Sequence, residues 1–169
     1  AYRVFQWLEK TFPQAKFHYI NAGIGGTTSH FGTARAESDL LSHKPDFVII
    51  EFSVNDESTE FFRETYEGLV RRVWQDENEP AVMLVHNVYY NNGGNAQIMH
   101  GQIARHYQLP AVSMQSSIYP EVVAGRIPNR EITEDDLHPN DKGHELVASV
   151  ITYALDKIRM AQTDDEEPE

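Results

Sequence analysis

Cysteine is absent from all 169 residues of this sequence. Without a thiol the chain can form neither disulfides nor thiolate metal sites, and cysteine-based catalysis is excluded. No apolar run approaches the roughly 20 residues that a membrane-spanning helix needs. Basic residues are also scarce, because 14 lysines and arginines face 26 acidic residues, for a net charge of −12. We therefore expect no nucleic acid and no anionic membrane as a partner, since both are bound through a basic face.

The sequence also lacks an initiator methionine and the basic-then-apolar layout of a signal peptide. It begins Ala-Tyr-Arg-Val-Phe-Gln-Trp-Leu, as a helix entered partway would, so we expect further sequence upstream. Residues 161–169 are mostly acidic and predict a disordered tail. Hydrophobic residues make up 40% of the chain, enough for one packed core. We expect a single domain over residues 1–160, truncated at its N-terminus.

Helical and strand patterns alternate along the chain. Apolar spacing predicts helices over residues 2–12, 31–42, 58–75, 95–107 and 139–160. Short apolar runs predict strands over residues 17–20, 46–52, 81–88 and 110–114. Strands separated by helices are typical of an α/β protein with a parallel sheet covered on both faces. Ligands of such sheets bind beyond the carboxyl ends of the strands, so polar clusters that follow strands are candidate sites.

Two polar clusters follow predicted strands. The glycine-rich residues 21–28 can turn backbone N–H groups toward a developing oxyanion, but an ordinary strand-to-helix turn also fits them. In residues 51–56, Asn55 can donate its side-chain amide to an oxyanion. The pair Asn55 and Asp56 is equally good turn chemistry at the end of a strand. Each cluster alone leaves both interpretations open.

A third cluster precedes the predicted C-terminal helix, where Asp135 lies three residues before His138. That spacing lets the carboxylate orient one imidazole nitrogen and leave the other free as a general base. Alternatively, Asp135 or Asp136 caps a turn, or Asp135, His138 and His144 bind a metal. No further histidine or carboxylate cluster has the spacing of metal ligands, which disfavours the last interpretation.

Taken in order, the three clusters resemble blocks of the SGNH (GDSL-like) hydrolase family. Residues 20–27, Ile-Asn-Ala-Gly-Ile-Gly-Gly-Thr, look like its second block, whose glycine donates a backbone N–H to the oxyanion hole. Residues 54–56, Val-Asn-Asp, look like the third block, whose asparagine is the other donor. Residues 135–139, Asp-Asp-Leu-His-Pro, look like the fifth block, which holds the acid and the base.

The resemblance implies a role for each matching residue. Asp135 would be the orienting acid and His138 the general base, with Gly26 and Asn55 as the oxyanion hole. It also implies a three-layer α/β/α sandwich with a flavodoxin-like parallel sheet, and a reaction that needs neither a metal nor an organic cofactor. The third block of the family usually has glycine two residues before its asparagine, where this chain has Ser53.

The first block of the family, which carries the nucleophilic serine after the first strand, has no counterpart in this chain. No serine present is a plausible substitute, so the resemblance places the nucleophile upstream. The family's strand order of 2-1-3-4-5 makes the missing strand an interior one. The predicted strands 17–20 and 46–52 would then face a gap with unpaired backbone groups, and the isolated chain is expected to be unstable.

The resemblance also implies a reaction and a substrate class. We expect a serine-type ester hydrolase acting through an acyl-enzyme on a small-molecule or carbohydrate ester, with an acetyl group on a sugar favoured. A non-catalytic carbohydrate- or protein-binding domain, and a lysophospholipase or thioesterase, are the alternatives. Arg35, Asp56 and Tyr89 are candidates for substrate contact, although Arg35 also fits a solvated helix face.

Overall fold

The computed structural model describes residues 1–164. Its sheet contains the parallel strands β1 (Phe47–Ile50), β2 (Ala81–His86) and β3 (Ala111–Ser113), in the order β1-β2-β3. Phe47 pairs with Ala81 and Leu84 pairs with Ala111. These strands are short, largely apolar runs without alternation, as expected where helices cover both faces of a parallel sheet.

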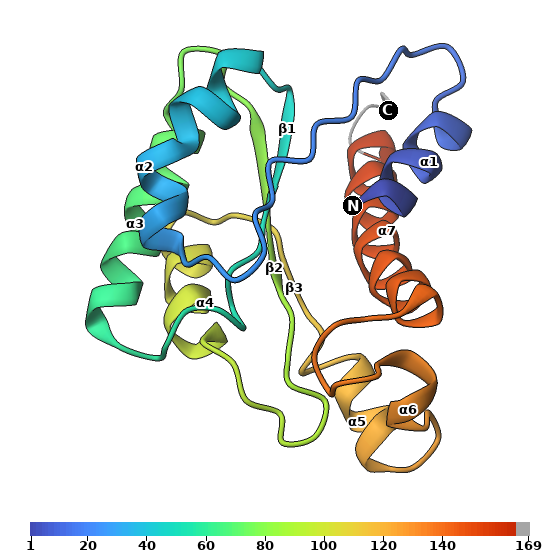
Figure 1. Cartoon of the computed structure of the whole chain (residues 1–169). Coiled ribbons are helices and arrows are strands. Elements are labelled where there is room, and N and C mark those ends of the chain that lie inside the picture. Colours follow the sequence, from blue (N-terminus) through green and yellow to red (C-terminus); the bar gives the residue numbers. More distant parts are fainter. Residues whose placement is uncertain (165–169) are drawn as a thin grey trace.

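Helices lie on both sides of the sheet (Figure 1). One face is covered by α2 (Ser29–Asp39), α3 (Glu60–Trp74) and α4 (Gln97–His106), and the other by α1 (Tyr2–Thr11) and α7 (Asp141–Asp164). Shorter helical segments are η1 (Leu41–His43), α5 (Ile118–Val123) and α6 (Asn129–Ile132). The expected three-layer α/β/α architecture is confirmed.

The hydrophobic core follows these layers as two clusters. The first joins α2, α3 and α4 to one face of the sheet and includes Tyr66, Val70 and Leu84. The second joins α7 and α1 to the opposite face and includes Met83, Val85 and Ile151. Alternate residues of β2 therefore enter different cores, because successive side chains of a strand point to opposite faces.

Local sequence explains where two important helices begin. The Thr59 side chain accepts a hydrogen bond from the Phe62 N–H at the start of α3. At the start of α7, the Asn140 side chain accepts from the Gly143 N–H at 3.1 Å. The last helix therefore begins at Asp141 and not at Pro139 as the sequence pattern suggested. No helix in the described part of the chain has the length and apolar character to cross a membrane.

Two expectations are corrected. Residues 17–20 are not a strand but coil, and Tyr19 and Ile20 are exposed. A strand exists only where its backbone pairs with a neighbour, and within residues 1–164 β1 pairs with β2 alone. The expectation of a disordered tail over residues 161–169 is also partly wrong, because α7 continues through Asp164. Residues 165–169 lie outside the described residues.

Candidate active site

The Asp135–His138 pair forms as the sequence spacing suggested. Asp135 Oδ2 lies 2.6 Å from His138 Nδ1. Asp135 Oδ1 accepts backbone N–H bonds from Leu137 at 3.1 Å and from His138 at 2.8 Å. The hydrogen bond to the His138 side chain, followed by these backbone bonds, holds the pKa of Asp135 far below its usual range. The carboxylate is thus an ionised acceptor for one imidazole nitrogen, which leaves Nε2 of His138 free to take a proton.

The pair sits at the tip of a loop that is closed at its base. An antiparallel bridge joins Thr133 to Pro139, so the acid and the base project together from the intervening turn. The His138 side chain is 80% exposed and the Asp135 side chain 54% exposed. The pair is therefore accessible to a reactant from solvent.

Asp136 holds this loop to the rest of the domain. Its backbone has a left-handed φ of 70°, which an Asp tolerates better than most residues. Its carbonyl accepts the Tyr90 N–H at 2.7 Å, and its carboxylate accepts from Asn129 at 2.6 Å and pairs with Arg130 at 3.0 Å. Of the adjacent carboxylates, Asp135 therefore orients His138 while Asp136 fixes the loop.

The glycine turn places Gly26 in a conformation that favours glycine. Its φ is 71°, and a Cβ built there would meet no atom within 4 Å, so backbone geometry and not space selects the residue. The Gly26 N–H has no hydrogen-bond partner among residues 1–164. On the neighbouring helix, Arg35 donates to the Ala22 carbonyl at 2.5 Å and so holds the start of the turn.

Asn55 lies in the loop between β1 and α3, beyond the carboxyl end of β1. Its backbone N–H bonds the Phe52 carbonyl at 3.0 Å, which forms a tight turn. The residue is exposed, and its side-chain amide has no hydrogen-bond partner in the described structure. Gly26 and Asn55 therefore each offer a free N–H donor, as an oxyanion hole requires.

Ser53 does not offer a nucleophile to this site. It is fully buried, and its hydroxyl bonds Glu51 Oε1 at 2.7 Å. Burial raises the pKa of Glu51, against the opposing effect of these Ser53 hydrogen bonds. Ser29 is likewise fully buried. No serine hydroxyl among the described residues is hydrogen-bonded to His138.

Comparison with known proteins identifies the family of this chain. Residues 3–146 match the GDSL-like lipase/acylhydrolase family. The chain belongs to this family. It is 26% identical over 155 residues to the thioesterase 1/protease 1/lysophospholipase L1 of Escherichia coli K12, a match that covers 86% of this chain and 70% of that protein. An acetylxylan esterase of Geobacillus stearothermophilus is 25% identical over 163 residues, covering 83% of this chain and 73% of the relative.

Solved structures of similar chains show the same fold. A two-domain esterase active on acetylated mannans, co-crystallised with mannopentaose, superposes with a TM-score of 0.94 and is 74% identical over the whole of this chain. The present chain spans 45% of the length of that esterase. A mutant of an acetyl-xylooligosaccharide esterase has a TM-score of 0.73 at 21% identity, which supports the fold.

For this family member, the residues expected to contact substrate have other partners. The Arg35 side chain is only 12% exposed, because it bonds the Ala22 carbonyl and pairs with Asp39 at 3.1 Å. Arg35 is therefore not a solvated residue of the helix face, and its contact with substrate stays a prediction. The Asp56 side chain is fully buried and is bonded by Ser29 and His100. Its burial removes it from direct substrate contact.

The loop that contains Tyr89 connects the two halves of the site. The Tyr89 hydroxyl donates to the Val54 carbonyl at 3.4 Å, in the turn that carries Asn55. The next residue, Tyr90, donates its backbone N–H to Asp136. Burial, with a smaller effect of the Glu51 charge, raises the pKa of Tyr90 to about 12. The sequence gives no sign of this contact, because the Tyr90 bond to Asp136 is made by the backbone.

The metal interpretation of the third cluster has no structural support in residues 1–164. No group of three histidine, aspartate or glutamate side chains there is arranged to hold a metal ion. His144 lies on α7, and burial lowers its pKa. The carboxylate of Asp135 is already occupied by His138 and two backbone N–H groups.

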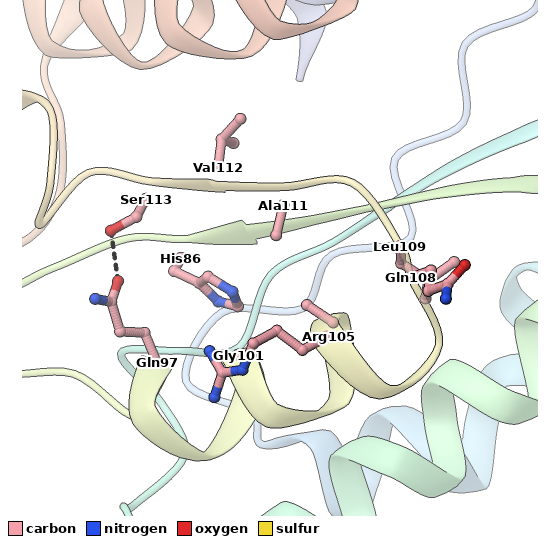
Figure 2. A pocket seen from close by; sticks show the side chains of 10 residues that line it. His86, Gln97, Gly101, Arg105, Gln108, Leu109, Ala111, Val112 and Ser113 are labelled. Carbon is pink, nitrogen blue, oxygen red and sulfur yellow. Dashed lines mark hydrogen bonds between the residues drawn. The ribbon is translucent and has the colours of Figure 1, made fainter. Parts of the chain in front are cut away.

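A separate cavity of about 520 Å³ lies between β3 and α4 (Figure 2). Its lining includes His86, Gln97, Arg105 and Ser113, and Gln97 accepts the Ser113 hydroxyl at 2.5 Å. Burial, assisted by the neighbouring His100, lowers the pKa of His86 to about 4. The lining of the cavity includes neither Asp135 nor His138, and neither Gly26 nor Asn55.

Proposed function

We propose that this chain carries the acid–base pair and the oxyanion hole of a serine-type ester hydrolase. Its nucleophilic serine would lie outside these 169 residues. The observation that carries the proposal is the 2.6 Å contact between Asp135 Oδ2 and His138 Nδ1, which leaves the other ring nitrogen free and exposed. The free donors at Gly26 and Asn55 would supply the oxyanion hole, so that the serine nucleophile is the remaining group that acyl transfer needs.

In the proposed mechanism, Nε2 of His138 takes the proton of the serine hydroxyl as its oxygen attacks the ester carbonyl. Asp135 keeps the imidazole in the required tautomer and stabilises the imidazolium. The Gly26 N–H and the Asn55 amide donate to the oxyanion of the tetrahedral intermediate. The imidazolium then protonates the leaving alcohol. Water, deprotonated by His138 in the same way, releases the acid from the acyl-enzyme and restores the serine.

We propose an acetyl ester on a carbohydrate as the substrate class. The support is the 74% identity to an esterase that acts on acetylated mannans, although this chain spans less than half of that protein. Charge agrees with this class, because a net charge of −12 disfavours anionic substrates and is indifferent to a neutral acetylated sugar. The match to a thioesterase and lysophospholipase supports longer acyl esters as a second candidate.

The test is hydrolysis of p-nitrophenyl acetate and of acetylated manno-oligosaccharides by the full-length polypeptide that contains this chain. We expect His138→Ala to lower kcat by at least about 10³-fold, because the general base is lost. His144→Ala, at another histidine close by in sequence, is the matched control and should keep wild-type rates. Equal rates for wild type and His138→Ala would refute the proposal. Faster turnover of long-chain p-nitrophenyl esters than of acetyl esters would favour the second candidate.

A further inference from the structure

One buried carboxylate links the two segments that carry the oxyanion donors. Asp56 Oδ1 accepts the backbone N–H of Ser29 at 2.8 Å. Asp56 Oδ2 lies 3.0 Å from Nε2 of His100 on α4. Neither side chain of the Asp56–His100 pair has any solvent exposure. A buried carboxylate is costly unless donors satisfy it, so this arrangement is a strong local constraint.

Asp56 and Ser29 each lie close in sequence to one of the two oxyanion donors. Asp56 directly follows Asn55, and its N–H bonds the Phe52 carbonyl at 2.9 Å, so carboxylate and amide belong to the same tight turn. Ser29 opens α2 and follows Gly26 by three residues. The Asp56 carboxylate, which belongs to the turn of Asn55, therefore holds the segment that follows Gly26 through the Ser29 N–H, 27 positions earlier in the chain.

His100 makes the second half of the link rigid. Its ring stacks on Tyr66 of α3 with centroids 3.6 Å apart and planes within 4°. Its Nδ1 is buried without a hydrogen-bond partner. Nε2 is thus the nitrogen that carries hydrogen toward the carboxylate, since a carboxylate can only accept. The stacked ring holds Asp56 in place from α4 while Ser29 binds the other oxygen.

The hydroxyl contact of Ser29 supports the same arrangement. Ser29 Oγ lies 2.8 Å from Thr65 Oγ1 of α3, and Thr33 Oγ1 donates to the Thr65 carbonyl at 3.1 Å. The start of α2 is thereby held to α3 independently of Asp56. Loss of the Asp56 carboxylate should therefore displace the donors by a small distance and leave the helices packed.

We propose that Asp56 and His100 are positioning residues that set the separation of the Gly26 and Asn55 donors. The inference rests on the proposed function, because it assigns a role within that oxyanion hole. Hydrogen bonds to an oxyanion are sensitive to donor placement, so a small shift lowers transition-state stabilisation more than substrate binding. The signature is a loss in kcat at nearly constant KM.

The experiment compares Asp56→Ala and Asp56→Asn in the full-length polypeptide, with kcat expressed per active site titrated by a phosphonate ester. Titration removes the contribution of misfolded protein. We expect Asp56→Ala to lower kcat per site by about 30-fold or more, with KM changed by less than about 3-fold. Asp56→Asn should recover most of this loss. Its amide can accept from Ser29 and donate to Nε2 of the other His100 tautomer.

A double-mutant cycle separates positioning from general destabilisation. In an Asn55→Ala background, Asp56→Ala should lower kcat per site by less than about 3-fold, because the amide donor that Asp56 positions is already absent. The matched control is His86→Leu, a buried histidine whose ring lies 6.0 Å from His100 and has no hydrogen-bond partner in the described structure. It should leave kcat per site unchanged. If Asp56→Ala fails to fold, His100→Leu and His100→Gln give the same comparison, since glutamine can replace the Nε2–H donor.

The outcomes distinguish this inference from the function on which it rests. If the wild type hydrolyses esters in a His138-dependent way but Asp56→Ala keeps its kcat per site, the positioning role is wrong and the function stands. Additive losses in the Asn55→Ala cycle would also overturn it. If the wild type has no His138-dependent activity, the proposed function fails and this inference fails with it.

Discussion

At the scale of single residues, the Asp135 carboxylate contacts the His138 imidazole, as their i, i+3 spacing suggested. Three hydrogen bonds converge on Asp135, two of them from the backbone of its own turn. Because all three donors come from the next three residues, the pair forms without help from distant parts of the chain. This is why its geometry could be predicted from sequence.

Asp135→Asn should separate the orienting role of the carboxylate from that of the base. Asparagine keeps the shape but presents an amide that can stabilise the wrong tautomer of His138. We expect kcat to fall by roughly 10² to 10⁴-fold, with a smaller change in KM. Steady-state kinetics of the full-length enzyme provide the measurement. A loss below about 3-fold would show that Asp135 does not orient the base.

The lowered pKa of Asp135 has a defined effect on pH dependence. The carboxylate stays ionised as the pH falls through its ordinary range, so its contact with His138 persists there. Asp135 should therefore add no protonation step of its own to the acid limb of kcat/KM, whose slope in a log plot against pH should not exceed 1. A slope of 2 would mean that a second group, such as Asp135, titrates in this range.

Other residues could be placed only by the structure. Asp56 was a candidate for substrate contact from sequence, yet its carboxylate is buried against Ser29 and His100. His100 lies 44 positions away in the chain, and no local pattern connects the two. The partner of Arg35 also could not be predicted from a local pattern, because the Ala22 carbonyl to which it donates lies 13 residues earlier.

At the scale of elements, the start of α7 determines where the acid–base loop can sit. Asn140 caps the helix through Gly143, and its own N–H bonds the Ile132 carbonyl at 2.9 Å. A Cβ on Gly143 would lie 2.3 Å from that Ile132 carbonyl oxygen. The helix can therefore approach the loop base only because this position has no side chain.

Gly143→Ala should consequently be destabilising. The added methyl collides with backbone, which cannot move aside cheaply, so we expect the free energy of unfolding to fall by about 2 kcal/mol or more. The esterase rate should fall as well, because the loop base shifts. Gly68→Ala in α3 is the matched control, since its Cβ would meet nothing within 4 Å.

Helix propensity predicts the opposite sign for the control. Replacing an unhindered helical glycine with alanine stabilises by about 0.5 to 1 kcal/mol. Thermal and urea unfolding of the full-length variants measure both effects. If Gly143→Ala were as stable as Gly68→Ala, the close approach of α7 to Ile132 would be disproved.

At the scale of the whole molecule, the two hydrophobic cores meet at a sheet whose β1 edge has no partner strand within residues 1–164. Phe47 and Ile49 on that strand are only partly buried. Residues 13–28 form no helix or strand, and Tyr19, Ile20 and Ile24 are exposed. Unpaired strand edges with apolar neighbours are sites of aggregation.

We therefore expect the 169-residue chain, when isolated, to unfold at lower temperature than the same residues within the full-length polypeptide, and to scatter light on heating. The physical reason is the unpaired backbone of β1 together with the exposed apolar side chains of residues 13–28. Circular dichroism and light scattering during thermal unfolding test this. A cooperative transition at a midpoint typical of mesophilic domains, without aggregation, would contradict the expectation.

The sequence by itself determined what is encoded locally: the buried strands, the amphipathic helices, the α/β class and the Asp135–His138 pair. In each case the interacting residues lie within a few positions, so spacing and residue type are sufficient. Only the tertiary structure decided that residues 17–20 are coil, that Asp56 is a buried link, and that Tyr90 holds the acid–base loop. These features depend on pairing and packing between distant segments, which a local pattern does not contain.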